Sequence, residues 1–123
     1  MALHRHAAPE AIDLDAFERE FLAGIGMPGA IGLRHRPAHF QHLFSGGGYA
    51  AGYYAYLWAE VLDADAFEAF REAGDPFHPD LAAGLRAIYE AGDTRDPMAL
   101  YTAFRGRPPA VEPLLRKRGL LEA

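Results

Sequence analysis

A chain of 123 residues is long enough for one domain with a modest hydrophobic core. Half of the residues are apolar and 12% are aromatic, which excludes a wholly disordered chain. A net charge of −5 without a long basic run argues against nucleic acid as a partner, and no stretch approaches the roughly 18 uncharged apolar residues of a membrane span. Because the chain has neither cysteine nor the apolar centre of a secretory signal, we expect a cytoplasmic protein without disulfides.

The first predicted helix follows a short tail. Residues 1–11 contain Pro9 and little periodic signal, so we expect a tail there and a single helical domain over residues 12–123. Asp13 is a suitable N-cap for a helix whose apolar side chains share one face (Leu14, Phe17, Phe21 and Leu22). Glycines and a proline over residues 24–29 are predicted to end this helix.

A glycine-rich loop and a tyrosine-rich helix are predicted next, within residues 40–58 (FQHLFSGGGYAAGYYAYLW). The three consecutive glycines are typical of a mobile loop or of a close approach to the backbone. No proline interrupts the chain after them, so we predict that the central helix begins near Tyr49. This helix either runs through to Ala73 or breaks at residues 63–65, where Asp65 would cap a new helix.

Two stripes of side chains would lie side by side on this helix. Tyr49, Tyr53 and Tyr56 fall at i, i+4 and i+7, so their phenol groups would share one face. The neighbouring stripe is apolar and is expected to face the core (Tyr54, Leu57, Trp58 and Val61). One interpretation is that the phenols form the partly buried edge of that core. The other is a binding site, in which the loop admits a substrate and the hydroxyls donate hydrogen bonds to it.

Three more helices are predicted from their start and stop signals. One begins at His78-Pro79 and ends at Gly92, the next begins at Asp96-Pro97 and ends at Gly106, and the last spans residues 111–118. The chain is therefore predicted to be all-α, with about five helices and a glycine-rich loop before the central one.

The order of residues from His42 to Trp58 is specific to one family. A histidine, a short spacer, the pair Gly47–Gly48 and the phrase GYAAGYYAYLW resemble the C-terminal region of the zinc metallopeptidases that include thimet oligopeptidase, oligopeptidase A and bacterial peptidyl-dipeptidase. The similarity is strongest to the peptidyl-dipeptidase branch and covers roughly residues 24–120, through WAEVLDADAF, FRGRPP and EPLLRKRGL. The spacer between His42 and Tyr49 is a residue or two longer than in the best-known members.

The resemblance implies the C-terminal helical part of a larger zincin-type metallopeptidase. In that family an HExxH helix and a further glutamate hold the zinc ion. This chain contains no HExxH, so none of its residues is predicted to bind the metal, and zinc is expected only in the full-length enzyme. The nearest sequence is His35-Arg-Pro-Ala-His39, in which Arg36 replaces the catalytic glutamate and Pro37 interrupts the helix.

The resemblance also implies which residues contact a peptide substrate. They are His42, Gly47, Gly48, Tyr49, Tyr53 and Tyr56. Tyr49 and Tyr56 are the catalytic candidates, since neutral phenols can donate hydrogen bonds to the oxyanion of the tetrahedral intermediate, whereas Tyr53 would contact substrate only. Without the metal-bearing half there is no activated water, so the chain alone is predicted to be inactive. Its expected partners are a peptide substrate and that missing N-terminal half.

Two other interpretations stay open. The chain could be a non-catalytic helical module that forms a homodimer or docks on a partner, because large exposed apolar surfaces usually find partners. It could also be a metal-binding protein that uses His35, His39 and His42. The basic residues near the C-terminus are interpreted as partners of acidic side chains on neighbouring helices (Arg105 and Arg107) and as a solvated helix end (residues 116–118).

Overall fold

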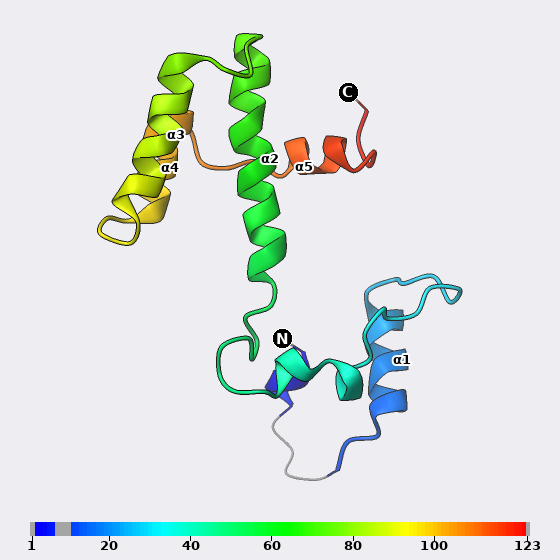
Figure 1. Cartoon of the computed structure of the whole chain (residues 1–123). Coiled ribbons are helices and arrows are strands. Elements are labelled where there is room, and N and C mark those ends of the chain that lie inside the picture. The colour runs from blue at the N-terminus through cyan, green and yellow to red at the C-terminus, as the bar shows by residue number, and fades with distance from the viewer. Residues whose placement is uncertain (1, 7–10, 123) are drawn as a thin grey trace. The chain divides into compact units, whose positions relative to one another are not determined.

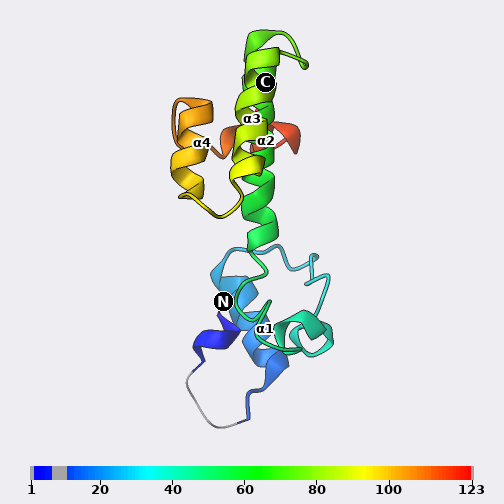
Figure 2. The ribbon, with the colours of Figure 1, turned by 60° about the vertical axis from the view of Figure 1, so that its left-hand side comes forward.

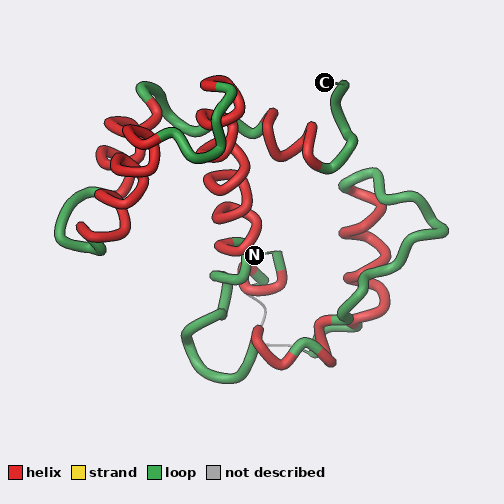
Figure 3. Tube along the Cα trace, turned by 45° about the horizontal axis from the view of Figure 1, so that its top comes forward, coloured by secondary structure: helices red, strands yellow, loops and turns green. Residues whose placement is uncertain are grey.

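The computed structural model describes residues 2–6 and 11–122, all of which are helical or irregular, with no strand among them (Figure 3). The five α-helices are α1 (Leu14–Gly24), α2 (Ala55–Ala73), α3 (Pro79–Ala91), α4 (Pro97–Arg105) and α5 (Glu112–Lys117) (Figure 1). Three short 3₁₀ turns precede α2: η1 (Leu3–Arg5), η2 (Pro37–His39) and η3 (Gln41–Leu43). The all-α prediction is confirmed.

The chain divides into two compact units, Met1–Tyr54 and Ala55–Ala123. We call them the first and the second unit and describe each by itself. A single domain over residues 12–123 therefore stays a prediction. Of the predicted tail, residues 1 and 7–10 lie outside the described residues.

In the first unit, α1 begins as its cap predicts. The Asp13 carboxylate accepts hydrogen bonds from the backbone N–H groups of Asp15 and Ala16, each at 3.0 Å. Arg36 binds α1 from the segment that follows, through ion pairs with Asp15 and with Glu18, whose Oε2 lies 3.1 Å from the arginine Nε. Arg36 thereby fixes the start of the segment that carries η2 and η3.

The predicted start of the central helix at Tyr49 is wrong, because α2 begins at Ala55. Residues 49–54 form turns, in which Ala51 has a φ of 52° and the Gly52 N–H donates to the Tyr49 carbonyl at 3.1 Å. A residue with positive φ cannot belong to a right-handed helix, so α2 starts only after it. From Ala55 the helix continues unbroken to Ala73, which confirms one of the two predicted alternatives.

In the second unit, α2 and α3 run antiparallel, α3 and α4 form a helical hairpin, and α5 crosses α2 (Figures 1 and 2). The predicted signals delimit these helices. The Asp96 carboxylate accepts a hydrogen bond from the Ala99 N–H at 2.7 Å, and Gly106 ends α4 with a φ of 76°. Helices α3 and α4 approach closely at Gly84, where an added Cβ would lie 3.0 Å from the Phe104 ring.

The buried apolar cluster of the second unit is small. Val61 and Ala64 of α2 meet Leu114 of α5. The apolar stripe predicted to face the core is mostly exposed: Val61 is 6% exposed, whereas Leu57 and Trp58 are 52% and 46% exposed, and Tyr54, in the first unit, is exposed as well. That prediction is wrong because α3, α4 and α5 pack along the later part of α2 and leave its first turns uncovered within the second unit (Figure 1).

Candidate substrate-binding site

The predicted site residues do not form one helical stripe. The second unit contains Tyr56, in the first turn of α2, and the first unit contains the others (His42, Gly47, Gly48, Tyr49 and Tyr53). A shared face for Tyr49, Tyr53 and Tyr56 would have required a helix that starts at Tyr49. Because α2 begins at Ala55, Tyr49 and Tyr53 lie outside the helix and the three side chains share no helical face.

Three of the predicted residues nevertheless meet in the first unit. The His42 ring lies 5.4 Å from the Tyr49 ring and 5.4 Å from the Tyr53 ring, and the two tyrosine rings are 5.6 Å apart, measured between centroids. The planes are inclined by 63–66°, the edge-to-face arrangement that aromatic rings prefer. The chain brings these rings together by reversing its direction through the glycine loop.

Phe40 and His35 also lie against these rings. Neither was predicted to contact a substrate, and His35 was considered only as a metal ligand. Phe40 contacts Tyr53 at 4.7 Å and His42 at 5.2 Å, and His35 stacks on Phe40 at 5.1 Å with only 10° between the planes. The only signal in the sequence was the presence of aromatic residues close before His42. We call the five rings the aromatic cluster (His35, Phe40, His42, Tyr49 and Tyr53).

The glycine loop borders the cluster. Gly46 adopts a φ of 81°, a left-handed conformation that favours glycine. Gly47 and Gly48 have no such requirement, and a Cβ added at either would meet nothing within 4 Å. These two glycines therefore leave the backbone open to a close approach, which agrees with the role that the resemblance implies for them.

The polar side chains of this site are hydrogen-bond donors. A phenol donates its O–H and an imidazole its N–H, and both can bind a peptide carbonyl oxygen. Tyr49 and Tyr53 are 39% and 38% exposed, and Tyr56 is 54% exposed, so solvent reaches all three side chains. Within the first unit, the donors of His42, Tyr49 and Tyr53 lie close enough together to bind one peptide backbone.

The described residues do not fit a zinc site. Over residues 2–6 and 11–122, no three His, Cys, Asp or Glu side chains are grouped so that they could hold a metal ion. His35 and His42 instead lie against the Phe40 ring. The geometry gives no support to the interpretation of the histidines as a metal centre.

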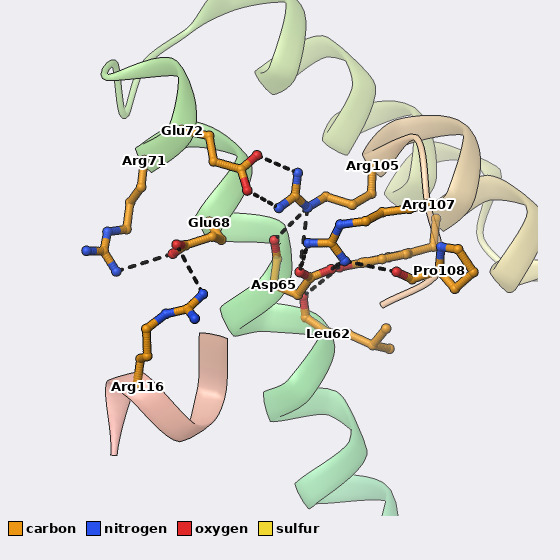
Figure 4. Close-up of polar contacts among 10 residues, drawn as sticks. Leu62, Asp65, Glu68, Arg71, Glu72, Arg105, Arg107, Pro108 and Arg116 are labelled. Atoms are coloured by element: carbon orange, nitrogen blue, oxygen red, sulfur yellow. Dashed lines mark hydrogen bonds and ion pairs between the residues drawn. The ribbon is translucent and has the colours of Figure 1, made fainter. Parts of the chain in front are cut away.

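A buried carboxylate organises the second unit (Figure 4). The Asp65 side chain, in the middle of α2, is fully buried. Its Oδ1 accepts a hydrogen bond from Arg107 Nη2 at 2.5 Å, and its Oδ2 accepts one from the Tyr101 hydroxyl at 2.7 Å. Burial acts to raise the pKa of Asp65, but the bonds from Arg107 and Tyr101 outweigh it and hold that pKa below its usual value. Asp65 is therefore an ionised core residue and not the helix cap considered above.

Arg105 extends this network along α2 (Figure 4). Its Nε donates to the backbone carbonyl of Asp65 at 3.1 Å, and its two terminal nitrogens bind the Glu72 carboxylate at 2.6 and 2.7 Å. This bidentate bond lowers the pKa of Glu72. The prediction that Arg105 and Arg107 pair with acidic residues of a neighbouring helix is confirmed.

The basic run at the end of α5 also pairs with α2. Arg116 contacts Glu68 at 3.5 Å and Lys117 contacts Asp63 at 3.2 Å. Arg118 forms an ion pair with Glu60. Lys117 and Arg118 keep 62% and 47% of their side chains exposed, as expected for a solvated helix end, so these pairs contribute little to stability.

Among the described residues, no helix is both long and apolar enough to cross a membrane.

Comparison with known proteins identifies the family of this chain. Peptidase family M3 matches residues 1–120. A probable cytosolic oligopeptidase A of Arabidopsis thaliana is 51% identical over 88 residues, which is 68% of this chain and 12% of the relative. A dipeptidyl carboxypeptidase of Escherichia coli is 41% identical over 109 residues, 88% of this chain and 16% of the relative.

Oligopeptidase A of Haemophilus influenzae is 49% identical over 86 residues, 69% of this chain and 12% of the relative. This chain thus spans between about one eighth and one sixth of the length of these relatives. The resemblance stated from the sequence is confirmed: the chain belongs to peptidase family M3.

Proposed function

We propose that this chain is the C-terminal substrate-binding part of a zinc metallopeptidase that cleaves short peptides, of the oligopeptidase or peptidyl-dipeptidase type. The observation that carries the proposal is the meeting of His42, Tyr49 and Tyr53 beside the open backbone of Gly47 and Gly48. Membership of peptidase family M3 supports it. The names of the relatives support it as well, since they are oligopeptidases and a dipeptidyl carboxypeptidase.

Each residue has a proposed part in binding. Gly47 and Gly48 let the peptide backbone approach, and His42 and Tyr53 donate hydrogen bonds to its carbonyl groups. Tyr49 and Tyr56 donate to the oxyanion that forms when the scissile carbonyl is attacked. Such a donor is most effective where water is excluded, and losing one costs about 100- to 1,000-fold in kcat.

The chain by itself is proposed to be inactive. It contains no HExxH sequence, and in this proposal the metal and the activated water come from another part of the enzyme. The partners proposed are therefore a peptide substrate and an N-terminal metal-bearing half. A cytoplasmic location stays a prediction, since the names of the relatives include both cytosolic and chloroplastic or mitochondrial forms.

Complementation tests this proposal. The remainder of the Escherichia coli dipeptidyl carboxypeptidase, cut before the region that matches this chain, is mixed with the purified chain, zinc and a fluorescence-quenched peptide. We expect neither part alone to cleave the peptide and the mixture to cleave it. Chelator-sensitive cleavage by this chain alone would contradict the proposed inactivity, and a mixture that stays inactive although the parts bind would contradict the proposed function.

Tyrosine variants test the assigned roles in the same mixture. Tyr49→Phe and Tyr56→Phe should each lower the restored kcat by about 100-fold or more. Tyr54→Phe is the matched control, because Tyr54 is 64% exposed and lies outside the proposed set. Restored activity that tolerates both Tyr49→Phe and Tyr56→Phe would refute the catalytic assignment.

A second candidate function is that of a non-catalytic module that forms a homodimer or docks on a partner. An apolar groove of about 300 Å³ between α2 and α3 favours it, lined in part by Phe67, Leu85 and Tyr89. Phe67 and Tyr89 are 54% and 76% exposed, as expected for a surface that another protein covers.

Sedimentation velocity over a wide concentration range tests this candidate. We expect a dimer that Phe67→Glu weakens, since the substitution places a charge in the groove. Phe77→Glu is the control, because Phe77 is exposed but does not line the groove. A single monomer peak at all concentrations would rule out self-association.

A further inference from the structure

We propose that Phe40 is a positioning residue of the substrate-binding site. It holds the His42 imidazole and the Tyr53 phenol in the orientation in which they meet a peptide, and His35 supports it from behind. The inference rests on the function proposed above for His42 and Tyr53. Phe40 has no hydrogen-bonding group in its side chain, so it would act only through the rings that it contacts.

Phe40 links the rings of His42 and Tyr53 to that of His35 within the aromatic cluster. It contacts Tyr53 at 4.7 Å and 80°, His42 at 5.2 Å and 42°, and His35 at 5.1 Å and 10°. The nearly perpendicular approach to Tyr53 and the parallel stacking on His35 are two of the geometries that aromatic pairs favour. Phe40 is half-buried, whereas His42 and Tyr53 are exposed, so it can support both rings from the protein side.

The backbone fixes the Phe40 ring in turn. Phe40 joins η2 to η3, and its N–H donates to the carbonyls of Arg36 at 3.0 Å and Pro37 at 3.3 Å. Its own carbonyl accepts a hydrogen bond from the Leu43 N–H at 3.0 Å. Since Arg36 forms ion pairs with α1, the position of Phe40 is tied to the longest helix of the first unit.

The orientation of His42 and Tyr53 depends on an aromatic ring at position 40. Leucine has similar apolar character but no flat face or polarised ring edge, so it would keep the burial and lose the orientation of His42 and Tyr53. Tyrosine would keep the ring. Phe44 is a matched control: it lies in the same segment, but its ring contact is with His4, at 6.1 Å.

Nuclear magnetic resonance of the whole chain tests the inference without any catalysis. The aromatic proton signals of His42 and Tyr53 are compared in Phe40→Leu, Phe40→Tyr and Phe44→Leu. We expect Phe40→Leu to move both sets of signals toward their positions in the urea-unfolded chain, while Phe40→Tyr and Phe44→Leu leave them near those of the unsubstituted chain. The signals of Phe17 and Phe21 in α1 should stay in place, because these rings lie outside the cluster.

Three results would overturn the inference. They are unchanged His42 and Tyr53 signals in Phe40→Leu, an equal shift in Phe40→Tyr or Phe44→Leu, and a simultaneous loss of the α1 signals, which would make Phe40 a merely structural residue. In the complemented peptidase, Phe40→Leu should lower kcat/KM by about 2- to 10-fold, mainly through a higher KM, and Phe40→Tyr should keep it near that of the unsubstituted chain. If the nuclear magnetic resonance result holds but the mixture never cleaves peptide, the proposed function fails and the positioning role of Phe40 survives.

Discussion

Replacing Asp65 with alanine should destabilise the second unit by about 2–4 kcal/mol. The substitution removes the carboxylate that accepts bonds from Arg107 and from the Tyr101 hydroxyl. Tyr101 is only 7% exposed, so its hydroxyl would be left with the Leu62 carbonyl at 3.4 Å as a weak acceptor, at a cost of about 1–3 kcal/mol.

The guanidinium of Arg107 adds less to this cost. Its side chain is 39% exposed, so water can replace part of the lost ion pair, and the total of about 2–4 kcal/mol lies toward the low end of the roughly 3–5 kcal/mol typical of breaking a buried pair. Arg105 keeps its bonds to Glu72 and to the backbone carbonyl of residue 65. Alanine also favours the helix slightly more than aspartate does, which offsets a few tenths of a kcal/mol.

Urea unfolding followed by far-ultraviolet circular dichroism measures this loss, because most of the helical residues belong to the second unit. Asp63→Ala is the matched control on the same helix, since its partner Lys117 is 62% exposed and the pair should contribute about 0.5 kcal/mol or less. Asp65→Asn should fall between the two, since an amide keeps one acceptor. Equal destabilisation by Asp65→Ala and Asp63→Ala would refute the reasoning.

Three further predictions concern the same unit. Burial and the bond to Asp65 raise the pKa of Tyr101 well above its usual 10.0. In an ultraviolet titration with alkali, one of the six phenols, that of Tyr101, should therefore ionise only as the second unit unfolds. Tyr101→Phe should remove that late step. The pKa of Asp65 is lower in the folded state than its unfolded-state value near 3.8. The ionised carboxylate therefore stabilises the fold fully above pH 3.8, and this stabilisation is lost as the pH falls through the folded-state pKa. Acid unfolding of Asp65→Asn should accordingly depend less steeply on pH than that of the unsubstituted chain. Gly106→Ala should cost about 1 kcal/mol in urea unfolding, because φ is 76° there while the added Cβ meets nothing within 4 Å, and an unchanged midpoint would contradict this.

Helix ends were predictable wherever the signal and its effect lie within a few residues. Asp13 and Asp96 accept hydrogen bonds from backbone groups two or three positions along the chain. Gly92 and Gly106 end their helices with positive φ. These interactions are local, so the sequence contains all the information that they require.

The start of α2 was not predictable in this way. The residues after the glycine loop have adequate helix propensity, yet Ala51 adopts a left-handed conformation that alanine rarely does. Helix propensity is a weak preference, and Gly52, directly after Ala51, is too weak a signal by itself to place the turn. The error changed the interpretation of the site, because Tyr49 and Tyr53 meet His42 across the loop.

The sequence by itself determined the all-α class, most helix boundaries and the family, because these depend on local patterns and on one long specific phrase. Only the tertiary structure decided which side chains are buried together. Asp65 accepts bonds from residues 36 and 42 positions away, Tyr101 and Arg107, and this pairing is what makes a charge tolerable in the core of the second unit. Phe40 likewise gained its place in the aromatic cluster only when the chain reversed and brought Tyr53 against it. A contact between distant residues depends on the path of the whole chain, which no local pattern specifies.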